Sequence, residues 1–127
     1  MDRETFEELV ARAVNNLPEE FQERLENVDI VVADRPTRYQ LSKSDTGPGE
    51  ILLGLYEGIP QTERGSHYGL VPPDKITVFQ KSIEAKCRGE WAITREIERV
   101  VRHEIAHHFG IGDAWLSQIE KEKYPPE

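Results

Sequence analysis

The sequence predicts a single α+β domain in which helices flank one small β-sheet. Three observations predict this fold. The chain has 127 residues, which suit one domain with one core, and no repeat or long linker divides it. Hydrophobic residues make up 37% of it and charged residues 31%, as in an ordinary globular protein. Segments with helical spacing stand at both ends and short apolar runs between them, in the order ααβββαα.

The N-terminal segment predicts two helices. Its apolar residues recur at helical spacing, which indicates an amphipathic helix. They are Phe6, Leu9, Val10, Ala13 and Val14. Pro18 then suits the first turn of a second, shorter helix, because the N–H that proline lacks is not needed there. Phe21 and Leu25 would face the core from that helix.

Three short runs predict the strands. Residues 28–33 (VDIVVA) and 51–56 (ILLGLY) are apolar and precede turn-forming residues, and residues 76–79 (ITVF) form the third run. Residues 42–49 (SKSDTGPG) are a loop by composition. Residues 60–73 hold three prolines and two glycines and predict a long loop, which in a compact domain is often functional.

The C-terminal half predicts the longest helix. A short helical turn is expected over residues 82–87. The long helix then runs from about Thr94, its expected N-cap, to Phe109. Gly110 ends it, because glycine readily adopts the left-handed conformation that closes a helix. A last short helix is expected over residues 113–121.

The acidic balance of the chain argues against some partners. A net charge of −8 disfavours nucleic-acid binding, which depends on Lys and Arg, and docking on anionic membranes. The N-terminus has no secretory apolar region, and no apolar run reaches the roughly 18 residues of a membrane span. Cys87 is the only cysteine, so we expect a small buried side chain there and a cytoplasmic location for the protein.

The motif that carries chemistry is HEIAHHFGIGD, at residues 103–113. His103 and His107 are four residues apart, so both imidazoles lie on one face of the long helix and can reach a single metal ion. Glu104 stands beside the first histidine. Its carboxylate can accept a proton from a zinc-bound water, whose pKa the metal lowers to about 7.

A third ligand is needed, because catalytic zinc usually takes three protein ligands and one water. After Gly110 the chain can turn back, so the spacing favours Asp113 as this ligand. The alternative is His108. A helical wheel places His108 towards the apolar core, which favours a packing role for it.

The pattern H103-E-x-x-H107-x-x-G110-x-x-D113 resembles the metzincin-type signature, with Asp in place of a third His. The chain as a whole resembles the small bacterial zincin-like metallopeptidases called minimal metalloproteases. Residues 51–65 and 70–80 resemble the segments that precede the active helix in that family. The resemblance implies one zincin-like domain over residues 1–127, with a small mixed β-sheet and the active-site helix in the C-terminal half.

The resemblance also implies a function. It assigns one zinc ion to His103, His107 and Asp113 and the role of general base to Glu104. The expected activity is zinc-dependent hydrolysis of peptide bonds in a peptide or protein substrate, by a monomer. Metzincins place a methionine turn beneath the metal, but Met1 is the only methionine here.

Two alternatives remain open. The chain ends soon after the metal motif, and metzincins have a further subdomain below the cleft, so a zinc-binding module without turnover is one of them. A metal-dependent ribonuclease is the other, and both Glu104 and the acidic charge argue against it.

The rest of the cleft is less defined by the sequence. An oxyanion needs a donor besides the metal, and the candidates are Tyr56, Arg64, His67 and Tyr68. For each of them, packing or surface exposure is the competing interpretation. The substrate would pair with an exposed strand edge. Trp91 and Trp115 flank the long helix in sequence and are expected in the core.

Overall fold

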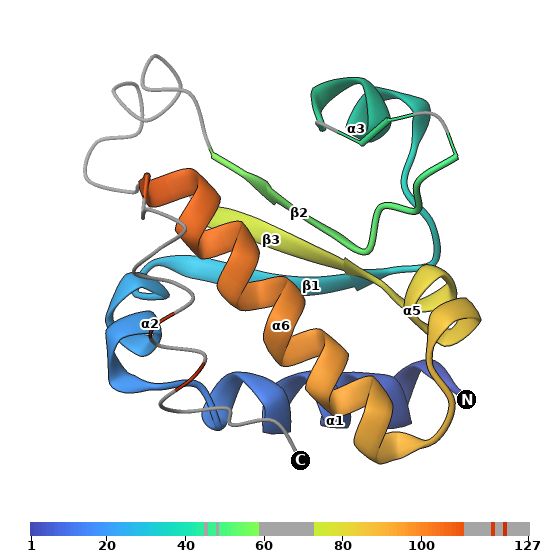
Figure 1. Ribbon diagram of the computed structural model, residues 1–127, viewed down its shortest axis with the longest axis horizontal. Helices are drawn as coiled ribbons and strands as arrows, with labels where there is room; N and C mark the ends of the chain where they lie inside the picture. The colour runs from blue at the N-terminus through green and yellow to red at the C-terminus, as the bar shows by residue number, and fades with distance from the viewer. Residues whose placement is uncertain (45, 48, 59–72, 111–117, 119–120, 122–127) are drawn as a thin grey trace.

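The computed structural model describes residues 1–44, 46–47, 49–58, 73–110, 118 and 121. Figure 1 shows the arrangement, with α6 running diagonally across the sheet and α1 crossing behind the N-terminal half of α6. The elements are α1 (Arg3–Asn15), α2 (Glu19–Arg24), β1 (Val28–Ala33), α3 (Arg38–Lys43), β2 (Gly54–Glu57), β3 (Asp74–Phe79), α5 (Gln80–Lys86) and α6 (Glu90–Phe109).

The sheet is small and mixed, as predicted. Its three strands lie in the order β1-β3-β2. β1 runs parallel to β3, with Val28 opposite Asp74. β2 runs antiparallel to β3, with Gly54 opposite Val78 and Tyr56 opposite Ile76. The predicted α+β class is therefore confirmed, and β2 is an edge strand of this sheet.

The core lies between the sheet and the helices α1 and α6. α6 contributes buried residues at helical spacing, among them Ile97, Val101 and Ile105, each with no exposed surface. α1 adds Phe6 and Leu9, which belong to the same apolar cluster. Burying this stripe fixes how α6 is rotated about its axis, and that rotation decides which residues of the helix face outward.

Most predicted elements are confirmed, but several predicted boundaries are wrong. Residues 38–43 form the helix α3, so the predicted loop at 42–49 begins inside a helix. β2 begins at Gly54, not at residue 51, and extends to Glu57. α6 begins at Glu90, so Thr94 is not its cap. The Thr94 hydroxyl instead donates to the Glu90 carbonyl at 2.7 Å, inside the helix.

The predicted burial of two side chains, Trp91 and Cys87, has different outcomes. Trp91 lies in the first turn of α6 and is 61% exposed, so its predicted core position is wrong. The outer side of this turn is not covered by the sheet, and Arg95 lies 5.5 Å above the Trp91 ring. Cys87 is half-buried against the core, and burial raises the pKa of its thiol, in line with its predicted packing role.

Some predicted segments lie outside the described residues. They are nearly all of the loop at 60–73 and most of the last helix at 113–121, of which Gln118 and Lys121 are described and are helical. Over the part of the chain that the structure describes, none of the helices is long and apolar enough to cross a membrane.

Candidate active site

The end of α6 presents the histidine motif. His103 and His107 are both exposed, whereas Ile105 and Ala106 between them are buried. The helix continues unbroken to Phe109, and Gly110 closes it in the left-handed conformation with φ 68°. The predicted helix and its glycine stop are therefore confirmed. The two imidazoles stand one turn apart on the side of α6 that the core leaves open.

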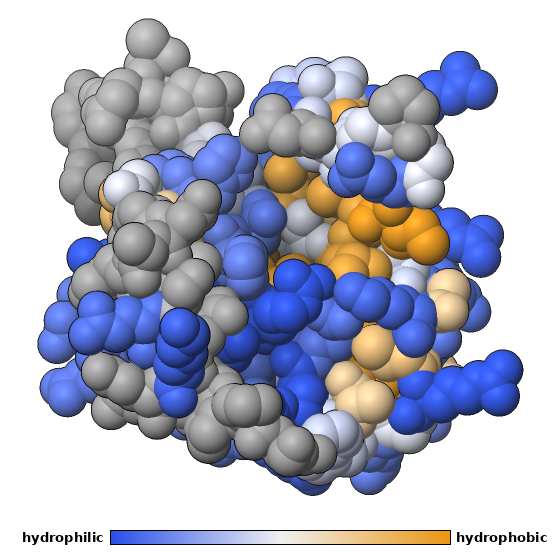
Figure 2. Space-filling model, in the orientation of Figure 1, coloured by the Kyte–Doolittle hydropathy of each residue, from blue (hydrophilic) through white to orange (hydrophobic). Residues whose placement is uncertain are grey.

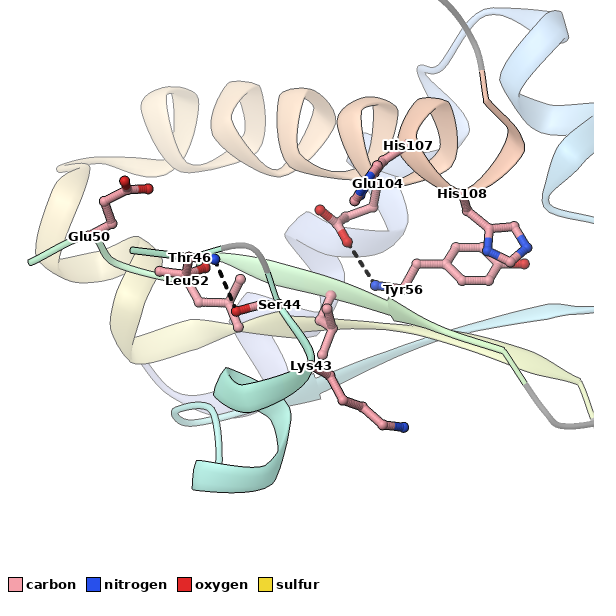
Figure 3. Close-up of a pocket in the computed structure, with 10 residues that line it drawn as sticks. Lys43, Ser44, Thr46, Glu50, Leu52, Tyr56, Glu104, His107 and His108 are labelled. Carbon is pink, nitrogen blue, oxygen red and sulfur yellow. Dashed lines mark hydrogen bonds between the residues drawn. The ribbon is translucent and has the colours of Figure 1, made fainter. Parts of the chain in front are cut away.

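Glu104 is turned towards the sheet. Its carboxylate oxygen Oε1 accepts a 2.8 Å hydrogen bond from the backbone N–H of Tyr56. Figure 3 shows this bond spanning the space between α6 and β2, with His107 beside Glu104. Residue 56 is 48 positions away in the sequence, so the contact depends on how α6 crosses the edge strand. One oxygen of the carboxylate is thus held in a fixed place.

The Tyr56 N–H can make this bond because of the strand register. Phe79 donates to the Leu53 carbonyl, and Leu55 stands opposite Thr77. In an antiparallel pair, alternate residues bond to the neighbouring strand. The N–H of Tyr56 therefore points away from β3, at the outer edge of the sheet. Glu104 lies at that edge.

A cleft of about 330 Å³ opens beside this contact. α6, β2 and the segment around α3 all contribute to its walls. Its lining residues are Lys43, Ser44, Thr46, Glu50, Leu52, Leu55, Tyr56, Glu104, His107 and His108. Figure 2 shows this face of the molecule, where apolar residues gather below α3 and hydrophilic residues cover α6. The cleft thus brings together an apolar wall and the polar face of α6.

His108 does not face the core, so that prediction is wrong. It is exposed, and its ring stacks on the Tyr56 ring with centroids 3.8 Å apart and an interplanar angle of 14°. The Phe109 ring meets it edge-on at 4.9 Å. The predicted packing role therefore stands, but the partner is an aromatic ring at the cleft and not the core.

Of the four oxyanion candidates, Tyr56 is the one that lies among the described residues. Its hydroxyl donates to Asp74 Oδ2 at 2.7 Å, so the hydroxyl hydrogen is directed to β3. This supports the packing interpretation for Tyr56. Arg64, His67 and Tyr68 lie outside the described residues.

The donor set at the end of α6 fits zinc. Zinc prefers imidazole nitrogens and carboxylate oxygens, and two imidazoles one turn apart can bind the same ion. Among the described residues, no group of three or more His, Cys, Asp and Glu side chains stands ready to hold a metal. Asp113, the predicted third ligand, lies outside them. The described part of the chain thus supplies two of the three predicted ligands.

Comparison with known proteins shows the family to which the chain belongs. A profile of the zincin-like metallopeptidases matches residues 25–123. The chain belongs to this family. The match runs from the end of α2 past α6, so it includes the sheet, the cleft and the histidine motif of the zincin-like chain.

A solved structure also resembles the zincin-like chain. It is described as a conserved hypothetical protein from Thermus thermophilus. The two share a TM-score of 0.53 and 24% sequence identity, over 86% of this chain and 94% of the other. At this identity the likeness shows a shared fold. No curated protein matches the chain.

Sequence reasoning missed several residues of the cleft. Lys43 and Ser44 reach it because α3 stands above β2. A local signal for α3 is present: Thr37 and Gln40 have capping-box spacing, and in the structure each side chain bonds the other's backbone N–H at 3.0 Å. The Glu104 contact has no such signal, because its donor is a backbone N–H that any residue type would supply.

Proposed function

We propose that this protein is a zinc-dependent peptidase that holds one zinc ion with His103, His107 and Asp113 and uses Glu104 as its general base. One observation carries the proposal. The Glu104 carboxylate lies in the cleft beside His107 and is held there by the Tyr56 N–H. A glutamate that served only to solvate the helix would not need a fixed orientation towards the open side of the sheet.

The chemistry divides between the metal and the chain. Zinc, when bound, supplies a Lewis acid that polarises the peptide carbonyl and activates water. His103 and His107 would bind it through imidazole nitrogens, and Asp113 through a carboxylate oxygen. Glu104, with Oε1 anchored, would take a proton from the attacking water at Oε2. It would then deliver that proton to the leaving amine nitrogen.

The substrate would lie along β2. An extended peptide binds readily at an exposed strand edge, where backbone hydrogen bonds hold it in register. β1 and β2 are both edge strands, but only β2 contributes to the cleft, through Leu55 and Tyr56. The apolar wall at Leu52 and Leu55 would then face substrate side chains. A peptide or an unfolded protein segment fits this arrangement.

Metal analysis combined with a peptide-cleavage assay tests the proposal. The purified protein should contain about one equivalent of zinc, and the Asp113→Ala variant should lose most of it. Glu104→Gln should keep the zinc and lose about 100- to 10,000-fold in turnover of a quenched-fluorescence peptide library, because general-base catalysis contributes that much. Glu90→Gln, the same change in the first turn of α6, is the matched control and should cleave like the wild type.

The outcomes separate the alternatives. Full zinc with no turnover on any library peptide would favour a zinc-binding module without catalysis. Unchanged zinc in Asp113→Ala would move the third ligand to another residue. Equal turnover in Glu104→Gln and the wild type would refute the role of Glu104.

A further inference from the structure

Three contacts converge on Tyr56. Its backbone N–H donates to Glu104 Oε1 at 2.8 Å, and its hydroxyl donates to Asp74 Oδ2 at 2.7 Å. Its ring stacks on the His108 ring at 3.8 Å. One residue of the edge strand therefore touches the proposed base, a neighbouring strand and the last turn of the active helix. The proposed function uses only the first of these contacts.

The helix itself would place His108 beside the base. Residues four apart on a helix are neighbours on one face, and Glu104 and His108 have this spacing. At about 100° per residue, Glu104 lies between His107 and His108 around the helix axis. An imidazole in this position could bond the Glu104 carboxylate, or could compete with Asp113 as a ligand of the metal. Either event would disable the proposed site.

The structure directs His108 elsewhere. The imidazole lies flat on the Tyr56 ring, with only 14° between the two planes. A Cβ placed on Gly58 would lie 3.7 Å from both His108 Cε1 and Asp74 Oδ1, so the imidazole edge occupies the space beside the end of β2. Figure 3 shows His107 and His108 pointing in different directions from the end of α6, with His108 alongside Tyr56.

The Tyr56 ring is itself fixed. Tyr56 stands opposite Ile76 on β3, and Asp74 is the residue two positions earlier on that strand. Such diagonal cross-strand neighbours lie on the same face of a sheet and are within reach of an aromatic side chain. The hydrogen bond to Asp74 holds the far end of the ring against β3, in addition to the stacking with His108.

We propose that Tyr56 is a positioning residue whose ring holds His108 away from Glu104 and from the metal ligands. The proposal rests on the proposed peptidase function for its consequence, but the stacking can be measured without metal or substrate. Tyr56→Leu removes the stacking ring and keeps the backbone N–H for Glu104. Tyr56→Phe keeps the stacking ring and loses only the hydroxyl that bonds Asp74, so it is the matched control for loss of the ring.

The first measurement uses the metal-free protein. The four histidines give separate imidazole signals in an NMR spectrum, each assigned by its own His→Gln variant. In the wild type and in Tyr56→Phe, the ring protons of His108 should be shifted upfield by the ring current of the aromatic partner. In Tyr56→Leu that shift should be lost. An unshifted His108 signal in the wild type would overturn the proposal, even if Tyr56→Leu fails to fold.

The second measurement adds zinc. In the wild type and in Tyr56→Phe, zinc should move the signals of His103 and His107 and leave that of His108 in place. In Tyr56→Leu the His108 signal should move as well, and turnover should fall at least about tenfold, because the base or the open metal position is taken. The double variant Tyr56→Leu/His108→Gln should recover that turnover.

These results distinguish the two proposals from each other. A wild type that binds no zinc or cleaves no peptide contradicts the peptidase, while the ring-current shift still reports the stacking. A His108 signal that moves with zinc in the wild type overturns the role of Tyr56. So does turnover that stays low after His108→Gln is added, because the loss would then come from general disruption of β2.

Discussion

Gly54 packs closely against α6, and an added methyl group there should be costly. A Cβ at this position would lie 2.5 Å from Val100 Cγ1 and 3.2 Å from the Thr77 carbonyl oxygen. Val100 is only 5% exposed, so its side chain cannot swing into solvent. Gly54 is not among the described residues with positive φ, so the penalty comes from the contact and not from the backbone.

The magnitude follows from two opposing effects. Overpacking a buried contact costs about 1–3 kcal/mol. Replacing glycine by alanine reduces the entropy of the unfolded chain, which returns about 0.4–1 kcal/mol. Gly54→Ala should therefore lower the free energy of unfolding by about 1–2 kcal/mol, which corresponds to roughly 3–8 °C in Tm for a domain of this size.

Urea unfolding of a double-mutant cycle measures the effect. Val100→Ala removes the Cγ1 atom that the new methyl group would meet. The Gly54→Ala/Val100→Ala variant should thus be more stable than the sum of the single changes allows, by about 1 kcal/mol or more. Gly58→Ala is the control, because its Cβ would meet atoms of Asp74 and His108 at an ordinary 3.7 Å.

The same variant should also disturb the site. Val100 lies four residues before Glu104 on α6, so a helix pushed away from β2 carries the carboxylate with it. The amide of Tyr56 should then exchange its hydrogen faster than in the wild type, since Glu104 is its partner. A Gly54→Ala variant as stable as the wild type, or a cycle with purely additive effects, would refute this reasoning.

Three further predictions concern α6 and its ends. Gly110 has φ 68°, in the left-handed region. Gly110→Ala should therefore destabilise the fold by about 1–2 kcal/mol, and Gly110→Asn by less. Equal Tm values for the two variants would contradict this. Glu98 is 5% exposed, and burial raises the pKa of its carboxyl above the usual 4.5. The free energy of unfolding should therefore fall as the pH rises above 4.5 and the buried carboxyl loses its proton. Glu98→Gln should accordingly raise Tm at pH 7.5 and leave it unchanged near pH 3, and no gain at the higher pH would disprove the argument. Burial works to raise the pKa of Glu96, but hydrogen bonds from Lys86 and Arg99 outweigh it and hold that pKa low. Glu96 therefore stabilises the fold above its usual 4.5 and loses this effect in acid, so Glu96→Gln should lower Tm at pH 7 but not near pH 3.

Local pattern was enough to predict the C-terminal part of α6. The spacing of Ile97, Val101 and Ile105 defines a buried stripe, and the position of His103 and His107 relative to that stripe follows from helical periodicity alone. The stop at Gly110 also follows locally, because left-handed φ is easy for glycine.

The N-terminal start of α6 shows where local pattern fails. Threonine is a common N-cap residue, yet Thr94 lies inside the helix, where its hydroxyl donates to the Glu90 carbonyl. The helix extends back to Glu90 past an exposed Trp91, because only its inner side must meet the core. A large aromatic residue therefore indicates burial only when the side it occupies is covered.

Sequence alone determined the residue types of the proposed site and their spacing along one helix. The tertiary structure decided what those residues face. Glu104 meets a backbone N–H from β2, and His108 meets the ring of the same Tyr56, because α6 crosses the edge strand at that point. Helical periodicity arises from neighbours in the chain, whereas a contact across 48 positions depends on packing that no local pattern records.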